Sequence, residues 1–226
     1  MKELKLLGKL IDLDKCPLLL ESHPDENWER DWQVMLGTWS CENGWLIGKE
    51  PGNFGGILFS RESFEGNVIL SFTAKTILPA TRDVNALFCA HWDTDINYLG
   101  NAYVVGLNGW YEGKSGIERS PETGLRCLTG AYTYTPGSEV RITTGIVDGH
   151  SFLYADDVLV TELIDPHAIS GGHVGFSPYS TALAIKDIEV RRGVWTAREQ
   201  SYTPDMLRNF LMKKMLRENF ETDSLK

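Results

Sequence analysis

The stretch EVRITTGIVDGHSFLYADDVLVTELI, residues 139–164, decides the fold class of this 226-residue chain. Runs of β-branched and aromatic residues alternate in it with short polar turns. Asp148-Gly149 lies between two such runs, which is a strong local signal for a tight β-hairpin turn. Ala155-Asp156-Asp157 forms a second turn. The stretch therefore predicts three consecutive antiparallel strands over VRITTGIV, SFLYA and VLVTELI.

Further strands are expected on both sides of this stretch. In residues 67–77, Val68, Leu70, Phe72 and Ala74 share one face of the expected strand, because side chains alternate along a strand. The runs 84–92 and 101–108 are instead almost continuously apolar, which is typical of strands that are covered on both faces. Additional strands are expected at 55–61, 173–179 and 182–192. A β-rich chain of this length suits one sandwich domain.

The end of the chain has a different pattern. Thr203 is a suitable N-cap with Pro204 at the first helical position, and apolar residues then recur at helical spacing. We expect residues 1–200 to form the β-sandwich and residues 201–226 to contain a C-terminal helix. Helix 204–221 either packs on the sandwich or docks on another subunit, which would give a homo-oligomer.

Charge and cysteine usage limit the partners and the compartment. The formal net charge of −9 argues against nucleic acid and anionic membranes as partners, since both repel a negative protein. Neutral ligands such as sugars remain open. We expect no signal peptide at the N-terminus, where Lys5, Lys9 and Asp12 interrupt the apolar run. No apolar run approaches a membrane span, and the four cysteines are scattered without CxxC pairs. We expect free thiols and a cytoplasmic location.

The order of several motifs resembles a known superfamily. These motifs are GTWSCENGWLIG (37–48), NVILSFTAKTI (67–77), DVNALFCAHW (83–92), SGIERSP (115–121), SFLYADDVLVTEL (151–163) and GGHVGFSPYSTALAIKDIEVRR (171–192). Together they resemble the concanavalin A-like lectin/glucanase superfamily, and within it the YesU-like bacterial proteins, over residues 30–192. The resemblance implies an all-β, antiparallel two-sheet jelly-roll sandwich whose concave face commonly receives carbohydrate. It also implies an association with plant cell-wall polysaccharide breakdown, but it does not specify a reaction.

The candidate binding residues lie in the aromatic and polar stretch 85–119. Sugar rings stack on Trp and Tyr, while their hydroxyls pair with Asn, Asp, Glu and Arg. The ligand-binding residues predicted on this basis are Asn85, Trp92, Asp93, Asp95, Tyr103, Trp110, Tyr111 and Arg119.

Strand alternation qualifies two of these assignments. Tyr103 shares a face with Val105 and Leu107, so it also fits the core. Glu118 and Arg119 are neighbours that face opposite sides of the expected strand, so only one of them reaches a ligand.

Three functions remain open. In the first, the protein is an enzyme, a glycoside hydrolase or lyase, that acts on a small oligosaccharide or modified glycoside, with His91 or Glu118 as the catalytic acid or base. A retaining hydrolase of the glucanase branch would carry Glu-x-Asp-x-Glu on one strand, and this chain lacks that motif. The second function is non-catalytic carbohydrate binding. The third is a subunit that assembles through helix 204–221.

Metal and cofactor signals are weak. Asp93, Asp95 and Asn97 offer oxygen ligands at alternate positions, which fits either a calcium site or a solvated turn, but the Gly and distal Glu of an EF-hand loop are absent. No two histidines have zinc-ligand spacing, and His150 is expected in a hairpin turn. We therefore expect no cofactor, with a structural calcium ion as the alternative and the metal ligands unknown.

Overall fold

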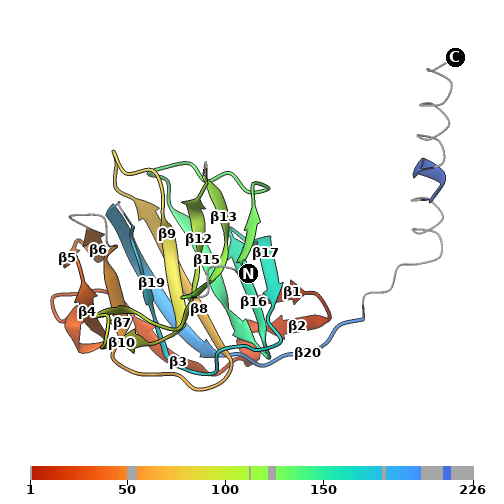
Figure 1. Cartoon of the computed structure of the whole chain (residues 1–226), viewed down its shortest axis with the longest axis horizontal. Coiled ribbons are helices and arrows are strands. Elements are labelled where there is room, and N and C mark those ends of the chain that lie inside the picture. The colour runs from red at the N-terminus through yellow and green to blue at the C-terminus, as the bar shows by residue number, and fades with distance from the viewer. Residues whose placement is uncertain are drawn as a thin grey trace, which may run out of the picture.

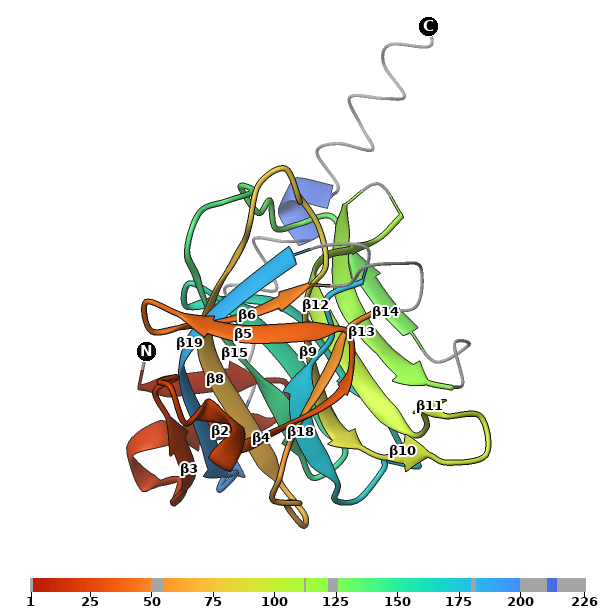
Figure 2. The ribbon, with the colours of Figure 1, turned by 90° about the vertical axis from the view of Figure 1, so that its left-hand side faces the viewer.

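The structure of the protein is a computed structural model that describes residues 2–49, 55–111, 113–121, 126–179, 182–199 and 211–214. Two large antiparallel sheets face each other and form the all-β jelly-roll sandwich expected from the sequence (Figures 1 and 2). Residues 211–214 are helical and exposed. The rest of the helix predicted at 204–221 lies outside the described residues.

The first large sheet has seven strands among the described residues, which follow one another in space as β14 (Arg126–Thr129), β13 (Lys114–Ser120), β12 (Ala102–Trp110), β9 (Val84–Ala90), β18 (His173–Phe176), β7 (Ile57–Ser60) and β4 (Trp32–Leu36). The second sheet has the order β17 (Val158–Ile164), β16 (His150–Ala155), β15 (Val140–Val147), β8 (Val68–Thr76), β19 (Ala182–Arg192), β6 (Trp45–Lys49) and β5 (Thr38–Glu42), with β3 (Leu18–Ser22) paired to β19.

Smaller elements flank the sandwich. A three-stranded sheet consists of β1 (Glu3–Leu6), β2 (Lys9–Asp12) and β20 (Thr196–Ala197), and a short hairpin consists of β10 (Trp92–Asp93) and β11 (Tyr98–Leu99). The part of the chain that the structure describes also contains two 3₁₀ turns, η1 (Leu13–Lys15) and η2 (Trp28–Arg30).

The predicted three-strand meander is confirmed. β15 pairs with β16 and β16 pairs with β17, both antiparallel. The position of His150 was predicted incorrectly, because Val147 and His150 are paired and the connecting turn contains only Asp148 and Gly149. His150 is therefore the first residue of β16 and is fully buried.

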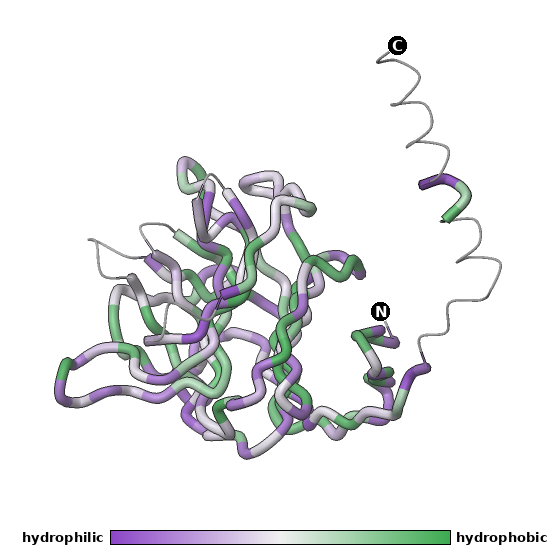
Figure 3. The backbone as a smooth tube through the Cα atoms, turned by 45° about the vertical axis from the view of Figure 1, so that its right-hand side comes forward, coloured by the Kyte–Doolittle hydropathy of each residue, from purple (hydrophilic) through white to green (hydrophobic). Residues whose placement is uncertain are grey.

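The main core lies between the two large sheets. Val68, Leu70, Phe72 and Ala74 of β8 all belong to it, which confirms the predicted alternation. Phe176 of β18 meets Phe72 across the sandwich, with ring centroids 4.9 Å apart. Figure 3 shows hydrophobic stretches of the backbone within the body of the sandwich. Burial of these large side chains supplies most of the favourable free energy of folding.

Strand β9 is buried on both faces, as its continuous apolar run predicted. Val84, Ala86 and Phe88 point into the main core. On the outer face, Leu87 and Ala90 belong to a second apolar cluster that also contains Leu99 of the β10–β11 hairpin. The hairpin segment therefore contributes to covering one part of the outer face of the seven-stranded sheet.

All four cysteines are free thiols, as expected. The pKa of Cys89 is raised to about 12 by its burial. No helix within the described residues is long and apolar enough to cross a membrane.

The Nε2 atom of the buried His150 lies 2.8 Å from the Oε2 atom of Glu162 on β17. Burial lowers the pKa of His150 below its ordinary value of 6.5, although the charge of Glu162 acts in the opposite direction. Above pH 6.5 the imidazole is neutral in both folded and unfolded chains. As the pH falls below 6.5, the unfolded chain takes up the proton first, so stability is lost.

A comparison of the wild type with the His150→Gln variant isolates this contribution. We expect the free energy of unfolding of the wild type to approach that of the variant as the pH is lowered from 8 to 5, because only the wild type contains the buried imidazole. Urea denaturation at several pH values measures the difference. The same difference at pH 5 and pH 8 would contradict the lowered pKa.

Candidate functional site

The outer face of the seven-stranded sheet carries a pocket of about 310 Å³, named here the inner pocket. Its lining comes from four strands and the loops beside them. The lining residues are Arg82, Asp83, Asn85, Tyr98, Leu99, Val104, Gly109, Trp110, Glu118, Ser120, Ser177 and Tyr179. Of the predicted site residues, the structure brings Asn85, Trp110 and Glu118 together here.

Strand alternation places the floor of the inner pocket. Tyr103 and Val105 face the core, so Val104 between them points outward, and it pairs with Glu118 on β13. Gly106 of β12 lies opposite Asn85 of β9. A Cβ atom at Gly106 would overlap with the Asn85 Oδ1 atom and with a β9 carbonyl oxygen. The Asn85 side-chain amide therefore occupies the space that a side chain at position 106 would need.

Glu118 is held in a fixed position at one side of the inner pocket. The Trp110 indole Nε1 donates a hydrogen bond to Glu118 Oε2 at 2.8 Å. The same oxygen lies 3.1 Å from Nε of Arg126 on β14. The carboxylate is thus oriented by a hydrogen bond from a neutral group and by an ion pair with a charged one.

Asp83 is the most perturbed acid of the inner pocket. It precedes β9 with a left-handed backbone (φ 61°) and is 2% exposed. Arg82 Nε donates to Asp83 Oδ2 at 2.8 Å, and Asn85 Nδ2 donates to Oδ1 at 3.4 Å. Burial raises the pKa of Asp83 from 3.8 to about 6, although Arg82 and Asn85 act in the opposite direction. Such a shift combined with a pocket position is a frequent property of functional sites.

Asn85 contributes an unused acceptor. The residue is 5% exposed, and its Oδ1 atom has no hydrogen-bond partner among the described residues. Buried polar atoms are nearly always paired in folded proteins, so an unpaired one at a pocket wall is a candidate contact for a ligand.

Arg119 and Tyr103 do not line the inner pocket. The Tyr103 hydroxyl donates to Asp165 Oδ2 at 2.6 Å, and Arg119 Nη1 donates to the same oxygen at 2.9 Å. The ring of Tyr103 is fully buried and stacks on Phe88 with centroids 5.2 Å apart. The two residues therefore belong to a buried network on the other face of the sheet. Strand alternation had indicated both that Tyr103 fits the core and that Arg119 and Glu118 face opposite sides.

The pKa values within this network follow from its contacts. Burial raises the pKa of the Asp165 carboxyl, but hydrogen bonds from Tyr103 and the His167 amide, together with the charge of Arg119, outweigh it. The net pKa of Asp165 is below its usual value. Burial, and then the bond to Asp165, raise the pKa of Tyr103.

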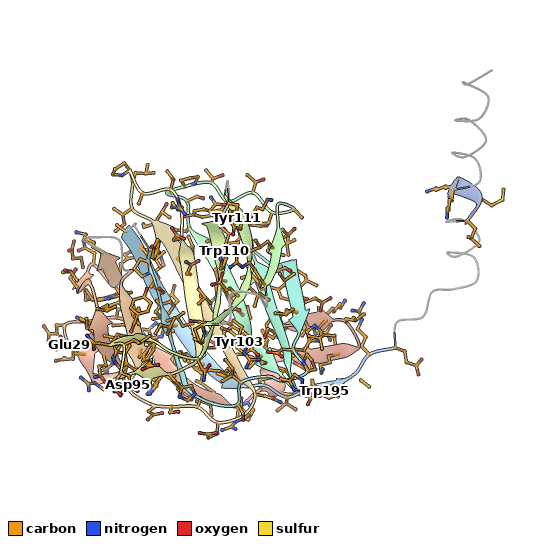
Figure 4. All side chains as sticks on the ribbon, in the orientation of Figure 1. Glu29, Asp95, Tyr103, Trp110, Tyr111 and Trp195 are labelled. Atoms are coloured by element: carbon orange, nitrogen blue, oxygen red, sulfur yellow. The ribbon has the colours of Figure 1, made fainter. Side chains whose placement is uncertain are left out.

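The other predicted residues lie at the far end of β9. His91 is six residues from Asn85, roughly 20 Å along a strand, and its Nε2 atom lies 3.2 Å from the Gly171 carbonyl oxygen. Trp92 packs edge-on against Phe59, with centroids 6.4 Å apart. Figure 4 shows Asp95 well away from Trp110. The structure thus separates His91 from Glu118, the other predicted catalytic residue.

The Asp93–Asn97 segment is a turn in the structure. Asp93 Oδ1 accepts hydrogen bonds from the backbone amides of Asp95 and Ile96, at 2.9 and 3.3 Å. Among the described residues there is no group of three or more His, Cys, Asp or Glu side chains that could hold a metal ion. A structural calcium ion remains a prediction from the sequence.

Tyr111 lies beside a second hollow of about 550 Å³, named here the outer hollow. The side chain is 65% exposed, and its hydroxyl accepts a hydrogen bond from Arg126 Nη1 at 3.0 Å. The outer hollow is lined by Thr81, Arg82, Asn108, Trp110, Tyr111, Gly113 and Pro136. Trp110 and Arg82 line both the outer hollow and the inner pocket.

Sequence reasoning did not select Asp83, Arg82, Ser177 or Tyr179 as site residues. Asp83 precedes a strand, where an acid is ordinary turn material, and its burial depends on tertiary contacts. Ser177 and Tyr179 follow β18, which lies next to β9 only in the folded sheet. A local pattern contains no signal for such long-range neighbours.

Comparisons with known proteins agree on the fold. No protein-family model matches the sequence, and no curated protein sequence matches it. A Bacillus subtilis protein of unknown function with a galectin-like fold is 14% identical at a TM-score of 0.64, covering 79% of this chain and 97% of its own. The carbohydrate-binding module CBM66 from Bacillus subtilis is 16% identical at a TM-score of 0.56, covering 71% and 95%.

A β-glucanase from Bacillus licheniformis is 10% identical at a TM-score of 0.52, covering 78% of this chain and 98% of its own. At these identities the likeness establishes the fold alone. The protein therefore has an all-β, two-sheet sandwich fold similar to the galectin-like fold of the Bacillus subtilis protein of unknown function.

Proposed function

We propose that this protein binds carbohydrate in the inner pocket. The observation that carries the proposal is the convergence in one pocket of Trp110 with the Asp83 and Glu118 carboxylates and the unpaired Asn85 oxygen. An aromatic face suits the apolar side of a sugar ring, and the oxygens accept hydrogen bonds from its hydroxyls. Solved proteins of similar fold include a carbohydrate-binding module and a β-glucanase, which supports the same class of ligand.

Trp110 is expected to be essential for binding. The Trp110→Ala variant should lose at least tenfold in sugar affinity, because it lacks both the stacking face and the donor that orients Glu118. Trp110→Phe keeps an aromatic face but lacks the indole N–H, so it should lose less. A thermal-shift screen with mono- and oligosaccharides, followed by isothermal titration calorimetry of the hits, measures both effects.

Trp195 provides a matched control for this experiment. It is a partly exposed tryptophan that lies far from Trp110 in Figure 4. Trp195→Ala should bind as the wild type does. Equal sugar affinity of Trp110→Ala and the wild type would contradict the assignment of the pocket, and the absence of any sugar-induced shift would contradict carbohydrate binding itself.

The second candidate function is glycoside hydrolysis, which the buried Asp83 favours. An acid with a pKa of about 6 is partly protonated near neutral pH and can act as a general acid. In such a reaction Asp83 gives its proton to the leaving glycosidic oxygen as the C–O bond breaks. Water adds to the anomeric carbon and loses its proton to a carboxylate, for which Glu118 is available in the same pocket.

Mass spectrometry of each sugar that binds distinguishes the two functions. Consumption by the wild type but not by Asp83→Asn would establish an enzyme, and binding without consumption would establish a binding protein. A YesU-like relationship, a cytoplasmic location and assembly through helix 204–221 are further proposals that rest on the sequence.

A further inference from the structure

The inner pocket and the outer hollow adjoin each other. Both are lined by Arg82 and Trp110, so these two side chains form the boundary between them. Tyr111 follows Trp110 directly in the chain, and Figure 4 shows the two at the same end of the sandwich. Trp110 therefore offers an aromatic side chain to both spaces, and Tyr111 offers a second one to the outer hollow.

The inner pocket is rich in hydrogen-bond acceptors. Asn85 offers its unpaired Oδ1 atom, and the Asp83 and Glu118 carboxylates line the same space. Their guanidinium neighbours, Arg82 and Arg126, are already ion-paired to these two acids. A sugar carboxylate placed here would meet two acids whose cations are engaged, whereas neutral hydroxyls would donate to the free acceptors.

The outer hollow offers a different surface. Tyr111 presents its ring while its hydroxyl accepts a hydrogen bond from Arg126, which holds the ring in place. Asn108 and Thr81 contribute neutral polar groups, linked by a 3.4 Å hydrogen bond from Asn108 Nδ2 to the Thr81 carbonyl oxygen. Such a surface suits stacking of a ring that remains partly in solvent.

We infer that the site takes a neutral oligosaccharide of at least two units. One ring occupies the inner pocket and donates hydroxyls to Asn85, the chain crosses at Trp110, and the next ring stacks on Tyr111 in the outer hollow. This inference rests on the proposed function, because it assigns the size and charge of the ligand of that same pocket.

Calorimetric titration of matched sugar series tests the inference. The probes are glucose, xylose and galactose, the β-1,4-linked di- and trisaccharides of each, maltose, maltotriose, galacturonate and digalacturonate. We expect a neutral disaccharide to bind about tenfold more tightly than its monosaccharide, which equals roughly 1.4 kcal/mol. The galacturonate series should not bind more tightly than the neutral one.

Two variants locate the two rings. Tyr111→Ala should weaken disaccharide binding about five- to tenfold and monosaccharide binding much less, since Tyr111 lines the outer hollow and not the inner pocket. Asn85→Ala should weaken the binding of both, because both fill the inner pocket. Trp195→Ala serves again as the distant aromatic control, and thermal denaturation confirms that each variant folds.

The outcomes separate this inference from the proposed function. Equal affinities for mono- and disaccharides, with Tyr111→Ala unchanged, would overturn the two-unit ligand while leaving carbohydrate binding intact. A preference for digalacturonate would overturn the neutral ligand. No binding by any of the probes would overturn the proposed function, and the inference with it.

Discussion

The Asp165→Ala variant is expected to lose about 3–5 kcal/mol of unfolding free energy, the range found when one partner of a buried ion pair is removed. Asp165 is 4% exposed and accepts three hydrogen bonds, from the Tyr103 hydroxyl, Arg119 Nη1 and the His167 amide, at 2.6, 2.9 and 2.8 Å. Alanine leaves a buried hydroxyl and a largely buried guanidinium without this carboxylate. The loss therefore includes the desolvation of both groups.

Urea denaturation measures this loss, and a thermal scan should show a fall of roughly 10 °C in Tm for a domain of this size. Tyr103→Phe, which removes one donor and leaves the ion pair intact, should lose only about 1.5–3 kcal/mol. Asp95→Ala removes an exposed acid and should stay within about 0.5 kcal/mol of the wild type. An Asp165→Ala variant as stable as Asp95→Ala would show that the network does not stabilise the fold.

The strands could be predicted because their signals are local. The Asp148-Gly149 turn and the β-branched runs around it specify the meander within one short stretch. Likewise, the alternation in residues 67–77 is a direct consequence of strand geometry, which places every second side chain of β8 in the core. His150 was misplaced by a single position, since a two-residue turn leaves it in the strand.

Only some residues of the inner pocket could be predicted from the sequence. Alternation separated Glu118 from Arg119, and the structure places Glu118 in the inner pocket and Arg119 in the buried network. The sequence could not show that His91 and Glu118 lie apart, because this depends on the register between β9, β12 and β13. Register over such long sequence separations is set by packing rather than by a local pattern.

The raised pKa of Asp83 could not be predicted from the sequence either. Its neighbours Arg82 and Asn85 are close in sequence, but its burial is a property of the assembled pocket. A buried acid with a raised pKa reduces the stability of the protein at neutral pH. Proteins commonly tolerate such a penalty where the group has a function.

Asp83→Asn is accordingly expected to be more stable than the wild type above pH 6. Burial raises the pKa of the Asp83 carboxyl from 3.8 to about 6. Below pH 3.8 the acid is protonated in both folded and unfolded chains, and above pH 6 it is ionised in both, so the full penalty applies only at the higher pH. A rise of this size corresponds to roughly 3 kcal/mol. The stability of Asp83→Asn relative to the wild type should improve by about 2.5 kcal/mol between pH 4 and pH 8, because a small part of the penalty is already present at pH 4.

Denaturation with urea at pH 4, 6 and 8 measures this difference, and Asp95→Asn is the matched control for the same chemical change at an exposed acid. Sugar binding and turnover are measured on the same wild-type and Asp83→Asn proteins. If Asp83 is a general acid, Asp83→Asn still binds the sugar and no longer cleaves it, so increased stability and lost turnover occur together. A stability difference that stays constant from pH 4 to pH 8 would show that Asp83 titrates normally, and would remove the main argument for catalysis in this pocket.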